Sequence, residues 1–349
     1  MKAACFHGIR QVKLEALAEP QIVSPTDAIV RVSVAGLCGS DLHPFCGRES
    51  GLDVGTVMGH EMVGEIVALG SQVCNFHVGD RVYAPFSTNC GQCYYCRNGL
   101  TSRCELGQLF GWVQQGVGLQ GCQSQYVRVP LASGTLKVIP NGINDRQALL
   151  LGDNLSTGFY CAELAEVSTG GVYVVIGCGT VGLLCILAAR HLGAERLIAI
   201  DPIVERRRMA ESLGAEVFAT GDSALTRIGE LTGNRGADAV MELVGIPSAQ
   251  QLAYKLIRPG GIMSVIGCHC TPHFGFSPAD AYDKNLTYRT GRCPARHYMD
   301  RLSESVKSGL LDVDLFITHE FSISECEQAY DIFANRKDGC LKAVFRLDE

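Results

Sequence analysis

The feature that most constrains the fold is a glycine-rich turn between an apolar strand and a helix. The stretch VYVVIGCGTVG (172–182) ends in G-x-G-x-x-G, with Gly177, Gly179 and Gly182 at the glycine positions. The β-branched run before the turn predicts a buried strand, and residues 180–192 have the composition of a helix. Glycines at this spacing allow a tight turn and a close backbone approach to a pyrophosphate, which the helix N-terminus would bind. The motif therefore predicts a dinucleotide-binding βαβ unit.

The alternation of strands and helices continues after this motif. Strands predicted at 196–200, 237–244 and 261–266 are separated by helices predicted at 204–213 and 248–257. Strands that alternate with helices form parallel sheets with helices on their faces. This part of the chain is therefore predicted to be of the α/β class, with a doubly wound parallel sheet.

An acidic residue after the second strand indicates which dinucleotide is bound. Asp201 lies nineteen residues after Gly182, where a carboxylate can accept both ribose hydroxyls of adenosine and would repel a 2′-phosphate. NAD is therefore favoured over NADP. Arg206, one turn into the next helix, could support the ribose or weaken that preference.

The regions on either side of this unit have a different character. Short Val-rich runs at 28–34, 62–69 and 125–129 are separated by turn signals, which predicts a β-rich domain with long loops. After Cys293 the chain has amphipathic helices predicted at 295–308 and 324–335, followed by a closing strand. The α/β segment therefore looks inserted between an N-terminal β-rich domain and a C-terminal return to it.

Four of the seventeen cysteines are clustered, and their role depends on the compartment. Cys90, Cys93, Cys96 and Cys104 have the spacing C-x2-C-x2-C-x7-C and could be disulfide partners, metal ligands or reactive thiols. The N-terminal sequence has no export-signal pattern, so we expect a reducing, cytoplasmic environment. Clustered cysteines in such a compartment are more often metal ligands, and four thiolates would close a tetrahedral zinc site.

A second group of metal-ligand residues lies earlier in the chain. Cys38 follows a predicted strand in GLCGSDLH (36–43), and His60 follows in GHE (59–61). A thiolate and an imidazole are good zinc ligands, and a catalytic zinc has three protein ligands and one open position. These residues alone do not identify the third ligand.

Composition argues against nucleic-acid and membrane partners. The net charge of −6 provides no basic field for nucleic acid or an anionic membrane. Residues 172–189 carry no charge and meet the length of a membrane helix, but three glycines interrupt them. We therefore interpret this stretch as a buried strand, a turn and a buried helix.

Taken together, the motifs resemble those of the zinc-dependent medium-chain alcohol dehydrogenases. The resemblance covers nearly the whole chain in family order: CGSDLH (38–43), GHE (59–61), GDRV (79–82), the four cysteines (90–104), GCGTVG (177–182) and Asp201. It implies a GroES-like β-rich catalytic domain plus a Rossmann cofactor domain. The implied boundaries are 1–153 for the catalytic domain, 154–292 for the NAD-binding domain and 293–349 for the return to the catalytic domain.

The resemblance also implies the metal ligands. In LLGDNLSTG (150–158), Asp153 stands where many relatives have a cysteine, as in tetrameric secondary-alcohol dehydrogenases and glutathione-independent formaldehyde dehydrogenases. Cys38, His60 and Asp153 would hold a catalytic zinc, with Glu61 as a supporting carboxylate or a fourth ligand. The four clustered cysteines would hold a structural zinc, a segment that some secondary-alcohol relatives lack. Four surface thiols without metal are the alternative.

A proton path and cofactor contacts are implied in the same way. The zinc would lower the pKa of the alcohol, and Ser40 would pass its proton through the nicotinamide ribose to His43, which we expect to reach solvent and titrate near neutrality. Thr157 and Val181 resemble positions that contact the nicotinamide ring, and Thr180 in the glycine-rich turn belongs with them.

The implied activity is that of an NAD-dependent zinc alcohol dehydrogenase acting on a secondary alcohol, diol or polyol, as a homo-dimer or homo-tetramer. Formaldehyde dehydrogenation or dismutation and threonine dehydrogenation are alternatives, and a non-catalytic zinc-binding protein is a remote one. A third cluster, Cys268, His269, Cys270 and His273, could bind a metal, but we interpret it as backbone of the cofactor pocket with incidental side chains. Surrounding loops and the partner subunit determine the substrate, so the sequence does not identify it.

Overall fold

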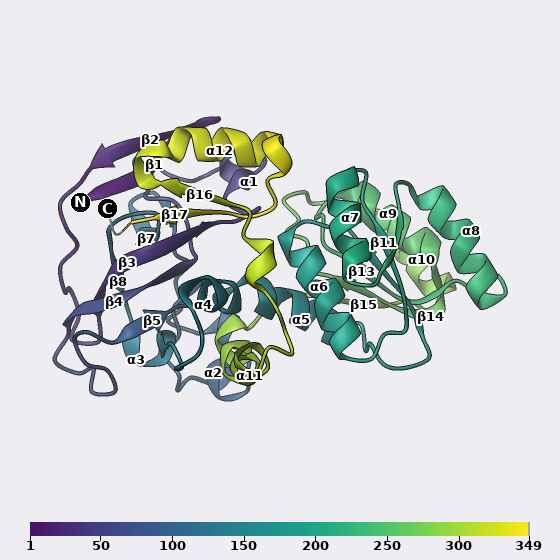
Figure 1. Cartoon of the computed structure of the whole chain (residues 1–349), viewed down its shortest axis with the longest axis horizontal. Helices are drawn as coiled ribbons and strands as arrows, with labels where there is room; N and C mark the ends of the chain where they lie inside the picture. Colours follow the sequence, from purple (N-terminus) through teal and green to yellow (C-terminus); the bar gives the residue numbers. More distant parts are fainter. Residues whose placement is uncertain (348–349) are drawn as a thin grey trace. The chain divides into compact units, whose positions relative to one another are not determined.

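The computed structural model describes residues 1–347, which form two compact units (Figure 1). The first unit contains Met1–Ser156 and the chain from Pro294 onward, and the second contains Thr157–Cys293. The helix α5 (Asn154–Leu164) begins in the first unit and continues into the second. The predicted GroES-like and Rossmann architecture is confirmed in these two units.

The first unit is built on a seven-stranded sheet in the order β16-β17-β3-β4-β5-β9, with β8 also paired to β3. Its strands are β3 (Ala28–Leu37), β4 (Met62–Leu69), β5 (Arg81–Tyr83), β8 (Tyr126–Val129), β9 (Lys137–Val138), β16 (His319–Ser322) and β17 (Ala343–Arg346). Two hairpins accompany it, formed by β1 (Lys2–Gly8) with β2 (Gln11–Ala16) and by β6 (Trp112–Gln114) with β7 (Val117–Leu119).

The helices of this unit are short except near the C-terminus. They are α1 (Leu42–Phe45), α2 (Tyr94–Arg97), α3 (Ala132–Thr135), α4 (Asp145–Gly152), α11 (Ala295–Lys307) and α12 (Cys326–Asn335), with the 3-10 turns η1 (Thr101–Arg103), η2 (Asp314–Phe316), η3 (Ile323–Glu325) and η4 (Lys337–Gly339). The helix α12 packs on β2 and contributes the buried Tyr330 to the core.

The register of three strands brings distant segments together at one end of the sheet. β3 is buried along most of its length, and its Ala, Val and Leu side chains contribute to the apolar core of this unit. β4 pairs with it antiparallel through Met62 and Ala35, and β17 pairs through Ala343 and Leu37. The residues just outside these pairs therefore lie beside the end of β3.

The second unit is a six-stranded parallel sheet in the order β12-β11-β10-β13-β14-β15, with helices packed around it (Figure 1). Its elements are β10 (Val172–Ile176), α6 (Thr180–His191), β11 (Arg196–Ile200), α7 (Val204–Ser212), β12 (Glu216–Phe218), α8 (Gly221–Thr232), β13 (Ala237–Glu242), α9 (Pro247–Leu256), β14 (Ile257–Val265), α10 (Pro278–Asp283) and β15 (Thr287–Thr290). The strand order reverses between β10 and β13, and this is the point where such sheets bind ligands.

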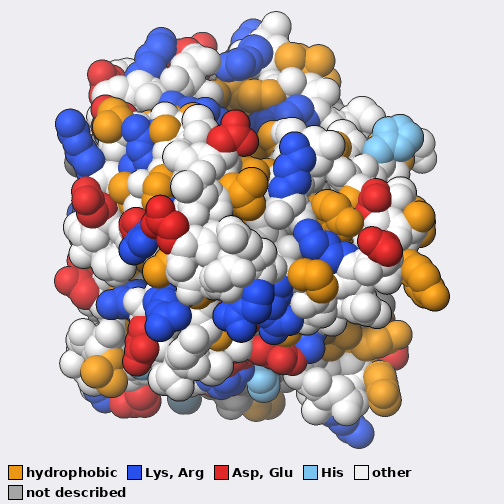
Figure 2. Space-filling model, turned by 90° about the vertical axis from the view of Figure 1, so that its right-hand side faces the viewer, with side chains coloured by type: hydrophobic (Ala, Val, Ile, Leu, Met, Phe, Trp, Pro, Cys, Tyr) orange, Lys and Arg blue, Asp and Glu red, His pale blue; other side chains and the backbone are white. Residues whose placement is uncertain are grey.

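The uncharged stretch from residue 172 is a strand followed by a helix, as the sequence predicted. None of the helices in the described part of the chain combines the length and apolar character needed to cross a membrane. On the face seen in Figure 2, basic and acidic side chains are interspersed, so this face has no separate basic field.

Candidate functional site

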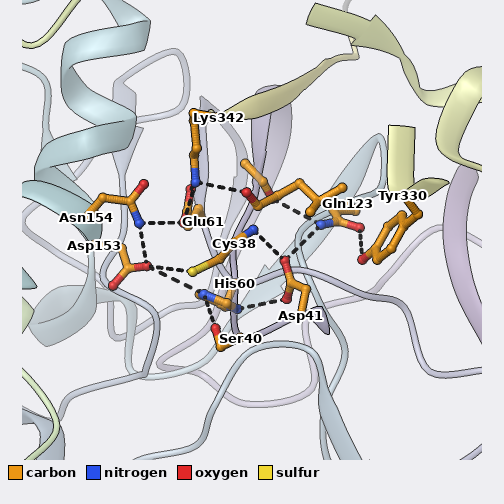
Figure 3. Close-up of polar contacts among 12 residues, drawn as sticks. Cys38, Ser40, Asp41, His60, Glu61, Gln123, Asp153, Asn154, Tyr330 and Lys342 are labelled. Atoms are coloured by element: carbon orange, nitrogen blue, oxygen red, sulfur yellow. Dashed lines mark hydrogen bonds and ion pairs between the residues drawn. The ribbon is translucent and has the colours of Figure 1, made fainter. Parts of the chain in front are cut away.

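Four potential metal ligands converge in the first unit. Cys38 directly follows β3, His60 and Glu61 directly precede β4, and Asp153 separates α4 from α5. One ligand atom from each of these side chains lies within 4.8 Å of all the others (Figure 3). The strand register explains this convergence, because the pairing of β3 with β4 places residues 60 and 61 beside the end of β3.

The donor atoms fit a tetrahedral metal ion. Cys38 Sγ lies 3.7 Å from Asp153 Oδ2, and His60 Nε2 lies 3.6 Å from the same oxygen. Zinc with bonds of about 2.0 to 2.3 Å separates tetrahedral ligands by roughly 3.3 to 3.7 Å. A thiolate, an imidazole and a carboxylate also match the ligand types that zinc prefers.

A buried hydrogen-bond chain orients His60. Its Nδ1 lies 3.1 Å from Asp41 Oδ1, so Nε2 is the nitrogen that faces Asp153. Asp41 Oδ2 accepts hydrogen bonds from the Cys38 backbone N–H (2.9 Å) and from Gln123 Nε2 (3.3 Å). Tyr330 in turn donates to Gln123 Oε1 at 2.9 Å. Carboxylates in this position fix the tautomer and orientation of metal-binding histidines.

Two buried side chains bind the Glu61 carboxylate. Lys342 Nζ donates to Oε1 at 2.7 Å and to Oε2 at 2.5 Å, and it also donates to the Leu37 carbonyl at 3.2 Å. Asn154 Nδ2 donates to Glu61 Oε1 at 2.9 Å and to Asp153 Oδ2 at 3.0 Å. Sequence reasoning missed the contributions of Asp41, Asn154 and Lys342. The first two lie in the motifs themselves, whereas only the pairing of β17 with β3 brings Lys342 to the site.

Burial and charge shift the pKa values of the ligands in different directions. Burial raises the pKa of the Cys38 thiol, and the nearby Asp153 carboxylate raises it further. Burial also opposes ionisation of Asp153, but the hydrogen bond and charge of His60 lower its pKa to about 2. Burial opposes the charge on His60, yet Asp41 and Asp153 raise its pKa well above the usual range. The site therefore gathers anionic donors away from water, an arrangement that a divalent cation would stabilise.

The two residues of the expected proton path have different environments. Ser40 Oγ lies 3.4 Å from His60 Nε2, on the side of the ring that faces the other donors. His43 in α1 is buried, and burial together with the charge of Arg48 lowers its pKa to about 4. Our expectation that His43 reaches solvent and titrates near neutrality is therefore wrong, because its side chain is 8% exposed.

The four clustered cysteines also converge. The Sγ atoms of Cys90, Cys93, Cys96 and Cys104 lie within 4.8 Å of one another, and none of the seventeen cysteines, all within residues 1–347, forms a disulfide. Backbone N–H groups donate to these sulfurs, among them Cys90 N–H to Cys104 Sγ (3.2 Å) and Cys93 N–H to Cys90 Sγ (3.3 Å). Backbone hydrogen bonds lower the pKa of Cys93 to about 6. Four thiolates with this geometry fit a closed tetrahedral zinc site.

The glycine-rich turn of the second unit has the geometry that its motif requires. Gly177 has φ +92°, which favours glycine, and a Cβ atom on Gly182 would lie 1.8 Å from the Gly177 carbonyl oxygen. Gly179 is the N-cap of α6, and Thr180 and Val181 form the first turn of this helix. A Cβ atom on Gly158 would lie 2.7 Å from the Cys185 backbone nitrogen, so α5, which carries Thr157, packs closely on α6.

Asp201 has a structural role that the sequence did not predict. It is buried, and its carboxylate accepts the backbone N–H groups of Cys178 and Ile203, both at 2.8 Å. Arg206 Nη1 lies 3.8 Å from Asp201 Oδ2. Asp201 therefore anchors the glycine-rich turn to the end of β11.

In the third cysteine-histidine cluster, His269 contacts other side chains of the second unit. His269 Nε2 lies 3.0 Å from Glu242 Oε2 and 3.1 Å from Gln250 Nε2. Glu242 also accepts the backbone N–H groups of Val244 and Gly245. His269 therefore belongs to a hydrogen-bond network within the second unit.

Comparison with known proteins identifies the family. The alcohol dehydrogenase GroES-like domain matches residues 24–140, and the zinc-binding dehydrogenase domain matches residues 180–308. The chain is 37% identical to the zinc-type alcohol dehydrogenase B of Aspergillus flavus, an alignment that covers 100% of this chain and 82% of that protein.

Solved structures agree with these matches. The alcohol dehydrogenase TADH from Thermus sp. ATN1 has a TM-score of 0.91 at 34% identity, with 99% of both chains covered. The 2R,3R-butanediol dehydrogenase from Bacillus subtilis has a TM-score of 0.83 at 26% identity, again with 99% of both chains covered. With relatives that align along its whole length, the chain belongs to the zinc-dependent medium-chain alcohol dehydrogenase family.

Proposed function

We propose that the chain is an alcohol dehydrogenase that transfers hydride between an alcohol and NAD, with secondary alcohols, diols or polyols favoured. The observation that carries this proposal is the convergence of Cys38, His60 and Asp153, whose donor distances of 3.6 and 3.7 Å suit one metal ion. The diol activity named for the Bacillus subtilis neighbour supports this substrate class.

Cys38, His60 and Asp153 would hold a catalytic zinc, with Asp41 as the group that orients His60. When bound, this zinc would act as a Lewis acid that lowers the pKa of the substrate hydroxyl. Ser40 Oγ lies 3.4 Å from His60 Nε2 and would accept the proton that the substrate releases. His43 has a pKa of about 4, so it stays neutral at pH 7 and is a weak acceptor for the last step of this proton path.

The four clustered cysteines would hold a second, structural zinc. They come from 15 consecutive residues, 90–104, that contain only the short α2 and η1. A metal in such a segment replaces the apolar core that it lacks. We therefore expect two zinc ions per chain.

We further propose that the second unit binds NAD in preference to NADP. Gly177, Gly179 and Gly182 would admit the pyrophosphate at the N-terminus of α6, and Thr157, Thr180 and Val181 would contact the nicotinamide half. Asp201 lies at the end of β11 with its carboxylate beside the glycine-rich turn, where it would accept the ribose hydroxyls. Arg206, 3.8 Å away, would limit the repulsion of a 2′-phosphate.

Replacing Asp201 tests this cofactor assignment. Asp201→Ser should shift the ratio of kcat/KM for NAD to that for NADP at least about tenfold toward NADP, because the charge that repels the 2′-phosphate is removed. It should also weaken NAD binding, because the carboxylate no longer holds the Cys178 N–H. An unchanged ratio would show that Asp201 does not read the ribose. Asp222→Ser, on the exposed start of α8, is the control.

A substrate panel tests the activity. Zinc-replete protein should reduce NAD with secondary alcohols, diols or polyols, measured by the absorbance of the reduced cofactor. Turnover of formaldehyde or threonine instead would assign one of the alternative activities. Bound zinc without turnover of any alcohol, amino alcohol or formaldehyde would favour a non-catalytic zinc protein.

We also propose a homo-dimer or homo-tetramer in the cytoplasm. None of the seventeen cysteines, all within residues 1–347, forms a disulfide, which supports a reducing compartment. Light scattering coupled to size-exclusion chromatography would give the mass of the assembly, and a monomer would contradict this expectation.

A further inference from the structure

Glu61 in the candidate catalytic centre could either bind the metal as a fourth ligand or support the site as a carboxylate. The Glu61, Lys342 and Asn154 side chains belong to residues that are each 1% exposed. The carboxylate receives two hydrogen bonds from Lys342 and one from Asn154, at 2.5 to 2.9 Å. Hydrogen bonds to a charged partner in a buried site are the strong ones. Both carboxylate oxygens are therefore already occupied by charged or polar donors.

Asn154 donates hydrogen bonds to both carboxylates of the site, those of Glu61 and Asp153. Its Nδ2 carries two hydrogens, one directed at Glu61 Oε1 and the other at Asp153 Oδ2. That Asp153 oxygen is the one that faces Cys38 and His60. Figure 3 shows Lys342 on one side of Glu61, with Cys38 and His60 on the other. The amide thus holds Asp153 toward the other donors while Glu61 is held toward Lys342.

The backbone of β3 supports the same position of Glu61. A Cβ atom on Gly36 would lie 1.9 Å from Glu61 Oε2, so the carboxylate occupies the space that a side chain would need. The Gly36 backbone N–H also donates to the Glu61 carbonyl at 3.0 Å. Glycine at position 36 therefore makes the Lys342-bound position of Glu61 available.

The charges of the site explain why Glu61 would stay there. Ionised Cys38, Asp153 and Glu61 carry three negative charges, and Lys342 with a divalent ion carries three positive ones. A Glu61 that moved to the metal would leave Lys342 buried without its carboxylate, which is strongly unfavourable. Lys342 keeps a carboxylate partner only while Glu61 remains bound to it.

We propose that Asn154 and Lys342 are positioning residues. Their hydrogen bonds to the Glu61 carboxylate keep it away from the metal, which therefore keeps three protein ligands and one open position. This inference rests on the proposed function, because it concerns the position that the substrate oxygen would take. It assigns Glu61 to the support of the site and not to the coordination shell.

Cobalt-substituted protein provides a test that does not depend on turnover. The visible absorption of Co(II) changes when a small ligand enters an open position, and imidazole is the probe. The four-cysteine site is closed and should not respond. Wild-type protein should show a saturable change with imidazole. In Lys342→Met, Glu61 loses its cation and should occupy the open position, so imidazole should bind about tenfold more weakly if Glu61 takes that position nine-tenths of the time.

Two further variants keep the proposal testable if Lys342→Met folds poorly. Lys342→Met/Glu61→Gln removes both charges and should recover wild-type imidazole affinity. Gly36→Ala leaves both charges but displaces Glu61 Oε2, and it should weaken imidazole binding as Lys342→Met does. Asn154→Leu should give a smaller loss. Lys255→Met, an exposed lysine of α9, is the matched control.

The outcomes separate this proposal from the proposed function. Unchanged imidazole affinity in both Lys342→Met and Gly36→Ala would overturn the positioning role of Lys342 while the open metal site stands. Failure of the double variant to recover affinity would also overturn it, because Glu61 would then not be the competing ligand. A wild-type protein that holds cobalt but gives no response to imidazole would overturn the open metal site on which the proposed function depends.

Discussion

The two cysteine-containing clusters of the first unit gather their ligand atoms within the same distance but are built in opposite ways. Cys90, Cys93, Cys96 and Cys104 come from one short segment, and backbone N–H groups bind their sulfurs. Cys38 and Asp153 are 115 residues apart and meet because strands and helices bring them together. In this buried site, charged side chains support the ligand residues: Asp41 binds His60, and Lys342 binds Glu61.

This difference indicates different tasks. A site with four thiolates from one loop is complete in itself and leaves no room for a substrate. A site with three ligands, each held by a neighbour, can keep a fourth position open without collapsing. We therefore expect substitutions in the buried site to affect chemistry most and substitutions in the four-cysteine site to affect stability most.

The Asp153→Asn variant should abolish the chemistry but leave the four-cysteine site intact. Loss of the carboxylate removes an anionic ligand and its contact with His60, so kcat/KM should fall by about a thousandfold or more. Elemental analysis should show close to one zinc per chain. The control is Asp222→Asn on the exposed surface of α8. Retained activity with two zinc ions would break the division of roles.

A smaller effect is expected from Asp41→Asn, which keeps all ligands but weakens the support of His60. Zinc affinity at the buried site should fall by about 10- to 100-fold, because Asp41 orients the His60 ring. Competition with a chromophoric chelator measures this affinity. Asp331→Asn, an exposed carboxylate of α12, should bind zinc as the unaltered protein does.

In the other cluster, Cys96→Ser should affect stability more than chemistry. The variant should lose the structural zinc and unfold at a Tm lower by roughly 5 °C or more. Activity per remaining zinc at low temperature should stay within about twofold, because the clusters share no ligands. The control is Cys74→Ser, an exposed cysteine outside both clusters. A complete loss of activity in folded protein would show that the clusters are coupled.

The smallest effect is a difference in thiol reactivity after zinc removal. Backbone hydrogen bonds lower the pKa of Cys93 to about 6, whereas burial raises that of Cys38. At pH 7 iodoacetamide should therefore modify Cys93 first and Cys38 late, because the thiolate is the reactive form. As the pH falls through about 6, Cys93 becomes protonated and its rate should decline. Peptide mass spectrometry gives both rates, and equal rates at pH 7 would contradict the contrast.

The same difference explains what sequence reasoning could find. The spacing of the four cysteines and the glycine-rich turn are local signals, and the structure gives both the expected geometry. Asp153 required a resemblance, because no local pattern links it to Cys38. Lys342 and Asn154 were missed because their roles depend on a strand pairing and on side-chain direction. The burial of His43 was misjudged for the same reason.

In the second unit, regular alternation made the first strands predictable, and β10 and β11 begin and end where expected. β14 begins four residues earlier than predicted, because a bulged pairing with β13 extends it across Pro259, Gly260 and Gly261. β12, α8, α10 and β15 were not predicted. β12 and β15 are short edge strands with few fully buried side chains, so their hydrophobic signal is weak.

The pairing of β17 with β3 has a consequence for how the protein matures. During synthesis Cys38, His60 and Asp153 leave the ribosome well before Lys342, and the whole second unit is made in between. Until β17 docks, Glu61 has no buried cation, and the half-made sheet still lacks a central strand. The support of Glu61 by Lys342 is therefore complete only after β17 has docked on β3.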